Sequence, residues 1–330
     1  MKKFIAISLC IGLLLSLCGC TTSRKLSSAE HDPLQNNTTP QTDVGVNEEA
    51  LAMKYEMALS LLIDDPAAWD GAKAMYAYQM ERAYELFVEL DSYGYKDSAE
   101  YLNKFILLSD VLLYDTLYET DESGESTMVI DSARGYHYNN VKRLLYRVDD
   151  LMDTTYYYTY VVGETTMVEK VALRVNGKLT QTILYNYSEQ GLLMSEELRT
   201  GETVDSSTDY TYDTESKLVK KYHHDDKNGD RETIYIYDGA DLPKQEVCTL
   251  VGTGITYTYT YTYDEDFRLI RSVTEKADAN DSDAAVVLTT IYEYENDRLV
   301  TETTFAGTDD NAVACGTRVY VYGDYYRYAP

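Results

Sequence analysis

The sequence is poor in basic residues: among 330 residues, 29 lysines and arginines stand against 56 aspartates and glutamates, a formal net charge of -27. This deficit argues against nucleic acid as a partner, because a phosphate backbone is bound by cationic side chains. It argues equally against electrostatic docking on anionic lipid. With only 5 prolines and 18 glycines, the chain also lacks the composition of a disordered, low-complexity protein.

Phenylalanine and tryptophan are scarce as well, and tyrosine takes their place. The chain has 5 Phe and 1 Trp but 34 Tyr. Tyrosine combines an apolar ring with a polar hydroxyl and favours β-strands. The hydrophobic fraction of 44% still allows a sizeable core, so the length fits one large domain or two ordinary ones.

Long apolar runs are missing apart from one at the N-terminus. Residues 4–17 follow two lysines and, at about fourteen residues, are too short for a comfortable membrane span but typical of a signal peptide. The run ends in Leu17, Cys18, Gly19 and Cys20. This ending resembles the lipobox of bacterial lipoproteins, which implies removal of residues 1–19 and attachment of a diacylglyceryl group to Cys20. The alternative is an ordinary secretory signal with a chance cysteine.

Residues 20–46 are expected to form a disordered tether behind the lipidated cysteine. They are rich in Thr, Ser, Asn, Gln and Asp and have few large apolar residues. The resemblance implies several acyl chains, which hold a protein stably on a membrane. We therefore expect an extracytoplasmic protein on the outer face of the cell membrane, with a Gram-positive envelope favoured.

Residues 47–113 are predicted to form a helical module, because apolar residues recur there at intervals of three and four. Asn47 is the expected cap of the first helix. A second helix is expected over 66–90 and a third from 97 to at least 108. The stretch 83–100 resembles tetratricopeptide-like helical pairs of Firmicute surface proteins. One repeat implies a helical hairpin or trio that packs on the rest of the chain, not an array.

Beyond about Thr127 the periodicity changes to two, and a Tyr-x-Tyr signature recurs at steps of about 25 residues. That spacing gives one β-hairpin per repeat. Asn176-Gly177 and Asn228-Gly229 supply expected hairpin turns. The pairs are Tyr136/Tyr138, Tyr158/Tyr160, Tyr185/Tyr187, Tyr210/Tyr212, Tyr235/Tyr237, Tyr261/Tyr263, Tyr292/Tyr294 and Tyr320/Tyr322.

Two of these blocks, 210–218 and 261–269, resemble the YD repeat of the Rhs family, Tyr-x-Tyr-Asp followed by two variable residues, Gly, Arg and Leu. In that family long arrays coil into hollow shells around a cargo, for which the repeats here are too few. We therefore expect an α+β fold: the helical module, then an open antiparallel β-meander over 114–330. A meander of about twelve to sixteen strands must curl, and its tyrosines are expected on the concave side, partly covered by the helices.

Groups with catalytic or metal-binding chemistry are few. Of four histidines, His31 lies in the tether, and His137, His223 and His224 are expected to be solvated strand residues. Adjacent strand residues point to opposite faces, so His223 and His224 cannot easily share a metal. No nucleophile elbow, phosphate loop or zinc spacing is present. The sequence therefore predicts no catalytic residue, no cofactor and no enzyme.

The acidic segment 225–230 superficially resembles a calcium loop. Counting from Asp226, however, Arg231 and Tyr237 occupy the sixth and twelfth positions, where an EF-hand needs glycine and a bidentate acid. An acidic hairpin turn is expected instead. Weak calcium binding stays open at this turn and at Asp278, Asp281, Asp283, Asp309 and Asp310.

Cysteine is nearly absent from the mature chain. Once the signal peptide is removed and Cys20 is lipidated, only Cys248 and Cys315 remain. They form either one disulfide or two isolated buried thiols.

One strand places Tyr257, Tyr259, Tyr261 and Tyr263 on the same face. Such a row stabilises a sheet by cross-strand packing or, if exposed, offers a surface for sugar rings or a protein. The leading hypothesis is a non-enzymatic, lipid-anchored surface protein whose sheet binds an extracellular protein or envelope polymer. The second is a carbohydrate-binding module for glycan adhesion or uptake, and the third an unrecognised enzyme.

Overall fold

The computed structural model describes residues 47–62, 76–121, 125–129, 132–139, 141–150, 153–164, 166–281, 285–308 and 314–329. The predicted signal peptide, Cys20, the tether and His31 lie outside these ranges. The described residues divide into two compact units, one holding residues 47–62 with 82–103 and the other 76–81 with the described residues from 104 onward. Among the described helices, none has the length and apolar character needed to cross a membrane.

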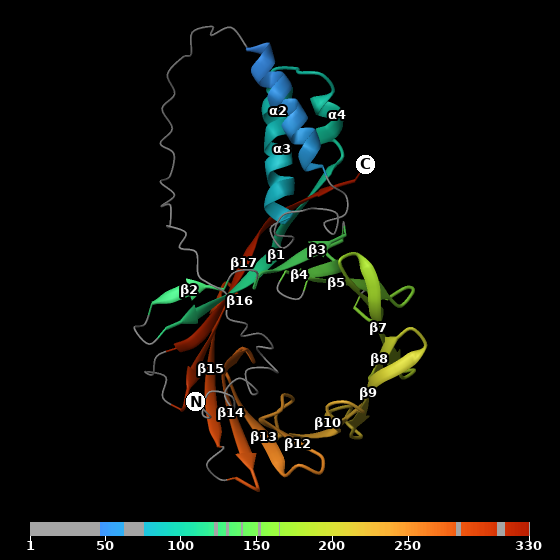
Figure 1. The fold of residues 1–330 in the computed structure, drawn as a ribbon, viewed down its shortest axis with the longest axis vertical. Helices are drawn as coiled ribbons and strands as arrows, with labels where there is room; N and C mark the ends of the chain where they lie inside the picture. Colours follow the sequence, from blue (N-terminus) through green and yellow to red (C-terminus); the bar gives the residue numbers. More distant parts are fainter. Residues whose placement is uncertain are drawn as a thin grey trace. The chain divides into compact units, whose positions relative to one another are not determined.

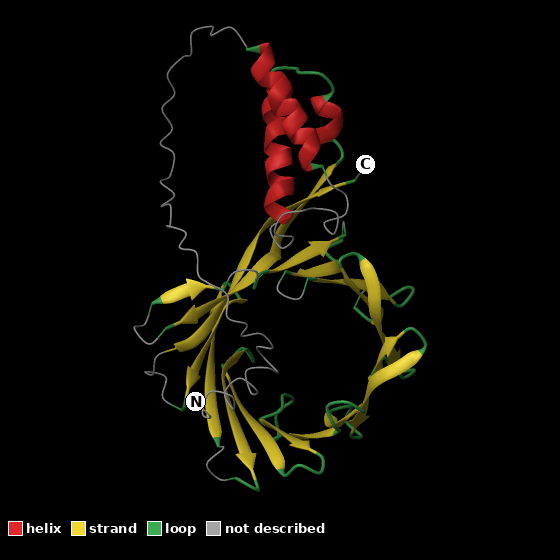
Figure 2. Ribbon diagram, in the orientation of Figure 1, coloured by secondary structure: helices red, strands yellow, loops and turns green. Residues whose placement is uncertain are grey.

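The helical unit contains α2 (Glu48–Leu61), most of α3 (Tyr76–Ser92) and α4 (Ser98–Leu102) (Figures 1 and 2). Asn47 caps α2 as predicted, because its side-chain Oδ1 accepts hydrogen bonds from the backbone N–H groups of Glu49 and Ala50. Within the helical unit the ring of Phe87 stacks on that of Tyr101, with ring centroids 4.7 Å apart. The buried residues of this unit include Leu51, Tyr55, Ala58, Ala83, Leu86, Phe87 and Leu90.

The second unit is a β-sheet of seventeen strands in the described residues. The first nine are β1 (Phe105–Thr120), β2 (Ser126–Met128), β3 (Arg134–Tyr138), β4 (Leu144–Asp149), β5 (Thr154–Tyr160), β6 (Val168–Val175), β7 (Lys178–Tyr187), β8 (Leu193–Thr200) and β9 (Thr203–Tyr212). The others are β10 (Leu218–Asp225), β11 (Arg231–Ile236), β12 (Gln245–Leu250), β13 (Ile255–Tyr263), β14 (Leu269–Asp278), β15 (Val286–Glu295), β16 (Arg298–Ala306) and β17 (Ala314–Tyr328).

The sheet closes into a barrel, so the prediction of an open meander is wrong. From β3 to β17 each strand pairs antiparallel with the next, as expected for successive hairpins. Strand β1 then pairs with β17 on one side and with β3 on the other, which joins the two ends of the row. The ring of strands is visible in Figures 1 and 2, and within the described residues the short β2 pairs with β1 alone.

The strand that closes the barrel is one that the sequence did not reveal. Residues 105–108 look like the apolar side of a helix, yet the helix α4 ends at Leu102 and β1 begins at Phe105. Strand β1 therefore runs across the predicted boundary between residues 113 and 114. Its pairing with β17, from Phe105 opposite Tyr328 to Glu119 opposite Gly316, supplies the tertiary contacts that decide its conformation.

The hairpin turns after the tyrosine pairs share one conformation. In four of them an Asp, Asn or Ser side chain accepts hydrogen bonds from the backbone N–H groups two and four residues ahead, and the residue three ahead has positive φ. The capping residues are Asn139, Ser188, Asp213 and Asp264. The positive-φ residues are Lys142, Gly191, Ser216 and Phe267. Only one of these four is glycine, the residue that adopts this conformation without strain.

The predicted Asn-Gly hairpins are confirmed. Asn176 and Gly177, both with positive φ, join β6 to β7 in a two-residue turn. Gly229 also has positive φ, and it lies in the connection between β10 and β11.

Candidate functional site

The first tyrosine of every pair lies directly opposite a residue of the next strand in the ring. The opposed pairs are Tyr136–Arg147, Tyr158–Val171, Tyr185–Glu196, Tyr210–Lys221, Tyr235–Glu246, Tyr261–Ser272, Tyr292–Glu302 and Tyr320–Asp115. On its other side, each partner residue lies directly opposite a residue of the following strand. That residue stands two positions before the first tyrosine of the next pair. Since directly opposed residues point to the same side of a sheet, these residues form one continuous row, which we call the tyrosine face.

The second tyrosine of each pair has a structural task. In seven repeats its hydroxyl donates a hydrogen bond of 2.8–3.1 Å to a backbone carbonyl of the preceding strand or its approach. The acceptors are the carbonyls of Leu112, Leu144, Val168, Leu193, Leu218, Pro243 and Leu269. These bonds hold neighbouring hairpins together at one end of their strands. The second tyrosine of the Tyr-x-Tyr signature therefore has a structural role in the barrel.

The tyrosine face is the less exposed of the two faces. All sixteen tyrosines of the eight pairs are half-buried, whereas the residue between them is exposed in six pairs. Those exposed residues are Thr159, Asn186, Thr211, Ile236, Thr262 and Glu293. Side chains converge on the concave face of a closed wall and spread apart on its convex face, so this pattern favours tyrosines that line the interior.

The row is closed at β1 by a buried charge cluster. The carboxylate of Asp115 has no solvent exposure. It accepts hydrogen bonds from Nε of Arg134, at 2.9 and 3.2 Å, and from the hydroxyl of Tyr136, at 2.7 Å. Arg318 of β17 forms a further ion pair with it. One carboxylate therefore links β1 with both of its neighbours in the barrel.

Elsewhere on the tyrosine face a glutamate lies between two tyrosines. Glu246 of β12 is opposite Tyr235 of β11, and a side-chain hydrogen bond joins it to Tyr261 of β13. Burial raises the pKa of Glu246, and burial together with this carboxylate raises the pKa of Tyr261. The same arrangement surrounds two other glutamates. They are Glu196, between Tyr185 and Tyr210, and Glu302, between Tyr292 and Tyr320.

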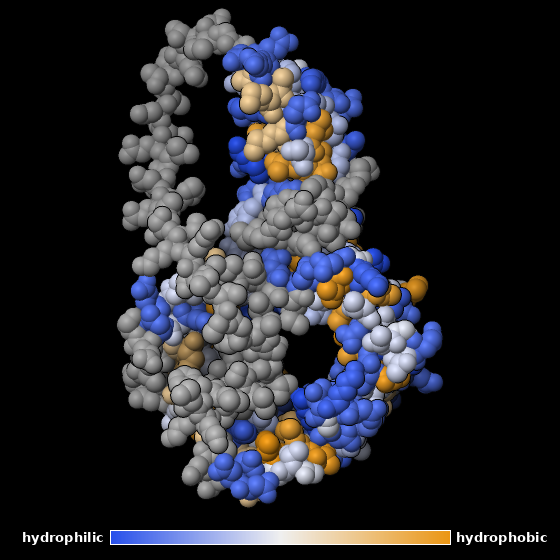
Figure 3. Space-filling model, in the orientation of Figure 1, coloured by the Kyte–Doolittle hydropathy of each residue, from blue (hydrophilic) through white to orange (hydrophobic). Residues whose placement is uncertain are grey.

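The opposite face of the barrel wall also carries charged residues. Those that alternate with the tyrosine-face positions include Lys170, Arg174, Glu197, Arg199, Asp209, Lys220, Glu232, Arg271, Glu275 and Glu293. In the view of Figure 3, hydrophilic and hydrophobic residues are interspersed over the strands. On the described strands, charged residues therefore interrupt both faces of the wall.

The tyrosine row singled out from the sequence is not a solvent-exposed surface. Tyr257 is buried, with 7% of its surface exposed, and Tyr259, Tyr261 and Tyr263 are half-buried. The hydroxyl of Tyr263 donates to the carbonyl of Pro243 at 2.9 Å. The four tyrosines do share one face, as predicted, and that face is part of the tyrosine face defined above.

The prediction that His137 is solvated is wrong. This residue is 1% exposed, its ring stacks on Tyr146 at 4.5 Å, and its Nδ1 lies 3.2 Å from the hydroxyl of Tyr325. Burial lowers the pKa of His137 to about 3, so the imidazole is neutral at physiological pH.

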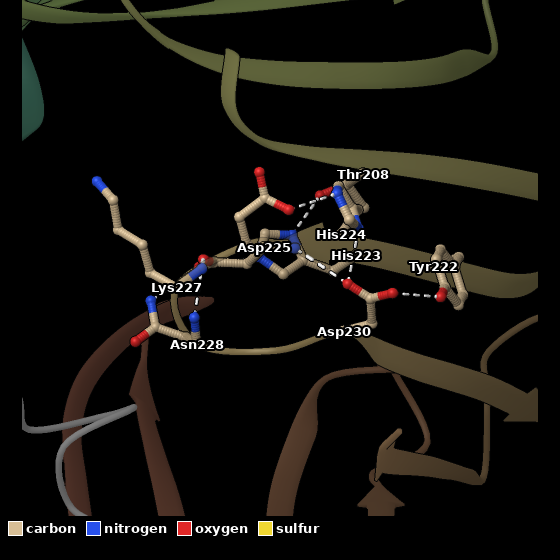
Figure 4. Close-up of polar contacts among 9 residues, drawn as sticks. Thr208, Tyr222, His223, His224, Asp225, Lys227, Asn228 and Asp230 are labelled. Carbon is tan, nitrogen blue, oxygen red and sulfur yellow. Dashed lines mark hydrogen bonds and ion pairs between the residues drawn. The ribbon is translucent and has the colours of Figure 1, made fainter. Parts of the chain in front are cut away.

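His223 and His224 point to opposite faces of β10, as predicted (Figure 4). His223 contacts the hydroxyl of Thr208 at 2.9 Å, whereas His224 lies 2.7 Å from a carboxylate oxygen of Asp230. The hydrogen bond to Asp230 raises the pKa of His224, and burial lowers that of His223.

The acidic segment is a hairpin turn held by its own hydrogen bonds (Figure 4). Asp225 accepts hydrogen bonds from the side-chain amide of Asn228 and from the backbone N–H groups of Asn228 and Lys227, and these bonds lower its pKa to about 2. Asp230 accepts from Tyr222 and contacts His224. Across the described residues, no three His, Cys, Asp or Glu side chains are grouped to hold a metal ion. Asp283, Asp309 and Asp310 lie outside those residues.

Both remaining cysteines are free thiols. Cys248 and Cys315 are half-buried, and no disulfide joins them, so the isolated-thiol alternative is the correct one. Burial raises the pKa of the Cys315 thiol, which keeps it protonated.

The partners of the first tyrosines are the part of this face that the sequence alone did not reveal. In five repeats the partner stands eleven residues after the first tyrosine, as Glu196 does after Tyr185 and Glu246 after Tyr235. That offset is the signal that would have found them. It becomes meaningful only once the turn length, and hence the strand register, is known.

Comparisons with solved structures find porin-like proteins at low similarity. No known protein family matches the sequence, and no curated protein matches it either. A porin-like protein from Bacteroides uniformis aligns over 64% of this chain and 96% of its own, with 10% identity and a TM-score of 0.37. A porin-like protein from Bacteroides vulgatus aligns over 64% of this chain and 99% of its own, with 10% identity and a TM-score of 0.39.

Proposed function

We propose that this chain is a lipid-anchored, extracytoplasmic and non-enzymatic binding protein. Cys20 carries the lipid, residues 20–46 are the tether, and the barrel stands in water beyond the membrane. The lipobox-like sequence ending at Cys20 supports the anchor. The charged residues on both faces of the wall support a barrel that is held near the membrane rather than inserted in it.

The observation that carries the binding role is the tyrosine face itself. Eight tyrosines, one in every second strand of the ring, each lie against a residue of the next strand, and seven of these eight partners are polar or charged. Tyrosine supplies a large contact area with little loss of side-chain entropy, which suits it to recognition. A closed barrel holds such side chains rigidly, because it has no free edge strands. The proposed ligand is an extracellular protein or an envelope polymer.

Fractionation tests the anchor. The full-length protein should partition into detergent, and the Cys20→Ala variant should remain in the aqueous phase. Equal aqueous partitioning of both forms would refute lipidation, whereas detergent partitioning of both forms would show that the barrel itself enters the membrane.

Capture experiments test the binding role. The Cys20→Ala protein, folded and purified without lipid, is offered to purified cell wall, a glycan array and secreted proteins, with and without calcium. Saturable capture that a tyrosine-face variant abolishes supports the proposal. Saturable binding to glycans alone would make the protein a carbohydrate-binding module, although the half-burial of Tyr259 and Tyr261 counts against ring stacking there. Failure to capture any of these partners would overturn the binding role.

A further inference from the structure

We propose that two clusters of the tyrosine face, each a glutamate held between two tyrosines, bind organic ammonium cations. The inference rests on the proposed role of the tyrosine face as a binding surface, and it adds the chemical class of the ligand. The first cluster is Glu246 with Tyr235 and Tyr261, and the second is Glu196 with Tyr185 and Tyr210.

The geometry places a carboxylate between aromatic rings. Glu246 is directly opposite Tyr235 on one neighbouring strand and directly opposite Tyr259 on the other. Directly opposed Cβ atoms lie about 5 Å apart in an antiparallel sheet, and diagonal neighbours such as Tyr261 about 7 Å, within reach of long side chains. The side chains of these tyrosines therefore lie within reach of a group that is bound to this carboxylate. A cation over the face of a tyrosine ring is attracted by the ring quadrupole.

The charge of Glu246 lacks a close partner. Among the described residues, neither Glu246 nor Glu196 forms an ion pair with a lysine, arginine or histidine. Lys221 interacts electrostatically with Glu246, and His223 does so with Glu196, but neither forms an ion pair with its glutamate. An ionised carboxylate has about four acceptor sites, of which the Tyr261 hydroxyl occupies one. A half-buried carboxylate with free acceptor sites is stabilised by a ligand that brings both positive charge and N–H or polarised C–H groups.

The barrel contains its own precedent for a cation at this place. Arg147 of β4 occupies the same register as Glu246, opposite the first tyrosine of its repeat, Tyr136. Its guanidinium lies over the ring of Tyr156, 4.2 Å from the ring centre. Tyr156 lies directly opposite Arg147 on the following strand. Tyr259 lies directly opposite Glu246 on its following strand in the same way. At this position of the face a cation of the chain therefore packs on the tyrosine that is directly opposite it on the following strand.

Glu302 shows why only two of the three glutamates are proposed. It is directly opposite Arg318 of β17, so a cation of the chain already faces it. No cation stands opposite the other two: Glu246 faces Tyr235 and Tyr259, and Glu196 faces Tyr185 and Thr208.

The test compares choline with dimethylbutanol, its uncharged carbon isostere, as probes for the folded Cys20→Ala protein by calorimetric titration. Choline should bind saturably and dimethylbutanol should not. The double change Glu196→Gln and Glu246→Gln should weaken choline binding about tenfold or more, since it removes the charge and keeps the shape. Glu275→Gln, which removes an exposed carboxylate from the opposite face, should leave binding unchanged.

Tyr261→Phe separates the two contributions to binding. It keeps the ring and removes the hydroxyl, so choline affinity should stay within about twofold of the unsubstituted protein, whereas Tyr261→Leu should weaken it. Circular dichroism and thermal melting confirm that each variant is folded. Absence of saturable choline binding by the folded protein, or equal affinity in the double glutamine variant, would overturn the inference. If a wall polymer or protein is captured with equal affinity by that variant, the binding role stands and the ammonium sites fall.

Discussion

At the scale of single residues, the two tyrosines of each repeat have different tasks. The second is structural: in seven repeats its hydroxyl donates a hydrogen bond to a backbone carbonyl, which we call the latch bond. Tyr212→Phe removes one such bond, to the carbonyl of Leu193, and should lower the free energy of unfolding by about 1 kcal/mol. Urea denaturation measures the loss. Tyr156→Phe is the control, because its ring still packs under Arg147; an equal loss there would contradict the role of the latch bond.

The turn residues make a second prediction at this scale. Phe267 has φ +63° and 71% of its surface exposed, so it holds a strained conformation with little packing in return. Phe267→Gly should stabilise the protein by about 0.5–1 kcal/mol. This net gain is the backbone strain that glycine relieves, reduced by the greater conformational entropy of glycine in the unfolded chain. Gly191→Ala, at the equivalent position of another repeat, should destabilise it by a similar amount. The midpoints of urea denaturation measure the change in stability of both variants. Stabilisation by Gly191→Ala would refute the shared turn conformation.

His137 predicts how stability depends on pH. Its pKa in the folded protein is about 3, against 6.5 for an unperturbed histidine, so between these values the unfolded chain binds the additional proton. The contribution of neutral His137 is therefore complete above pH 6.5 and is lost as the pH falls toward 3, by up to about 1.4 kcal/mol per pH unit.

Denaturation across that pH range should show the slope, and His137→Gln should reduce it. His224 is the contrasting control, because Asp230 raises its pKa and its contribution is lost as the pH rises. An unchanged slope in His137→Gln would mean that the imidazole is not buried.

At the scale of secondary-structure elements, the junction of β1 with β3 and β17 depends on one buried carboxylate. Asp115→Asn would leave Arg134 and Arg318 without their shared counter-charge, a loss of about 3–5 kcal/mol when the pair is buried. Hydrogen exchange should quicken first in β1 and β17, with the other hairpins less affected. Asp209→Asn, at an exposed position of β9, should change little, and a comparable effect there would show that Asp115 has no special role.

The elements themselves divide into those that local sequence determines and one that it does not. The hairpin repeats were predictable, because turn residues such as Asn176-Gly177 and the alternating tyrosines act over a few residues. Strand β1 was not, because its apolar start fits a helix as well as a strand. Its conformation depends on β17, and the ion pair between Asp115 and Arg318 joins residues 203 positions apart.

At the scale of the whole molecule, the tyrosine face is a product of closure. Each glutamate lies between tyrosines of two different hairpins, and the Asp115 cluster joins the first strand to the last. The sequence predicted that the tyrosines share a face, because period two is a local property. It could not show which residues lie opposite them, because the register depends on every intervening turn.

Closure of the ring can be tested directly by a disulfide. Tyr118 of β1 and Thr317 of β17 are directly opposed across the closing pair. Opposed residues in an antiparallel pair have Cα atoms about 4.5–5.5 Å apart, within the range that a disulfide spans. With Cys248 and Cys315 changed to serine, the double variant Tyr118→Cys and Thr317→Cys should oxidise spontaneously and gain resistance to thermal unfolding. In an open meander these strands would lie at opposite ends of the row, and no intramolecular bond would form. Tyr118→Cys combined with Thr208→Cys, far around the ring, is the matched control and should remain reduced.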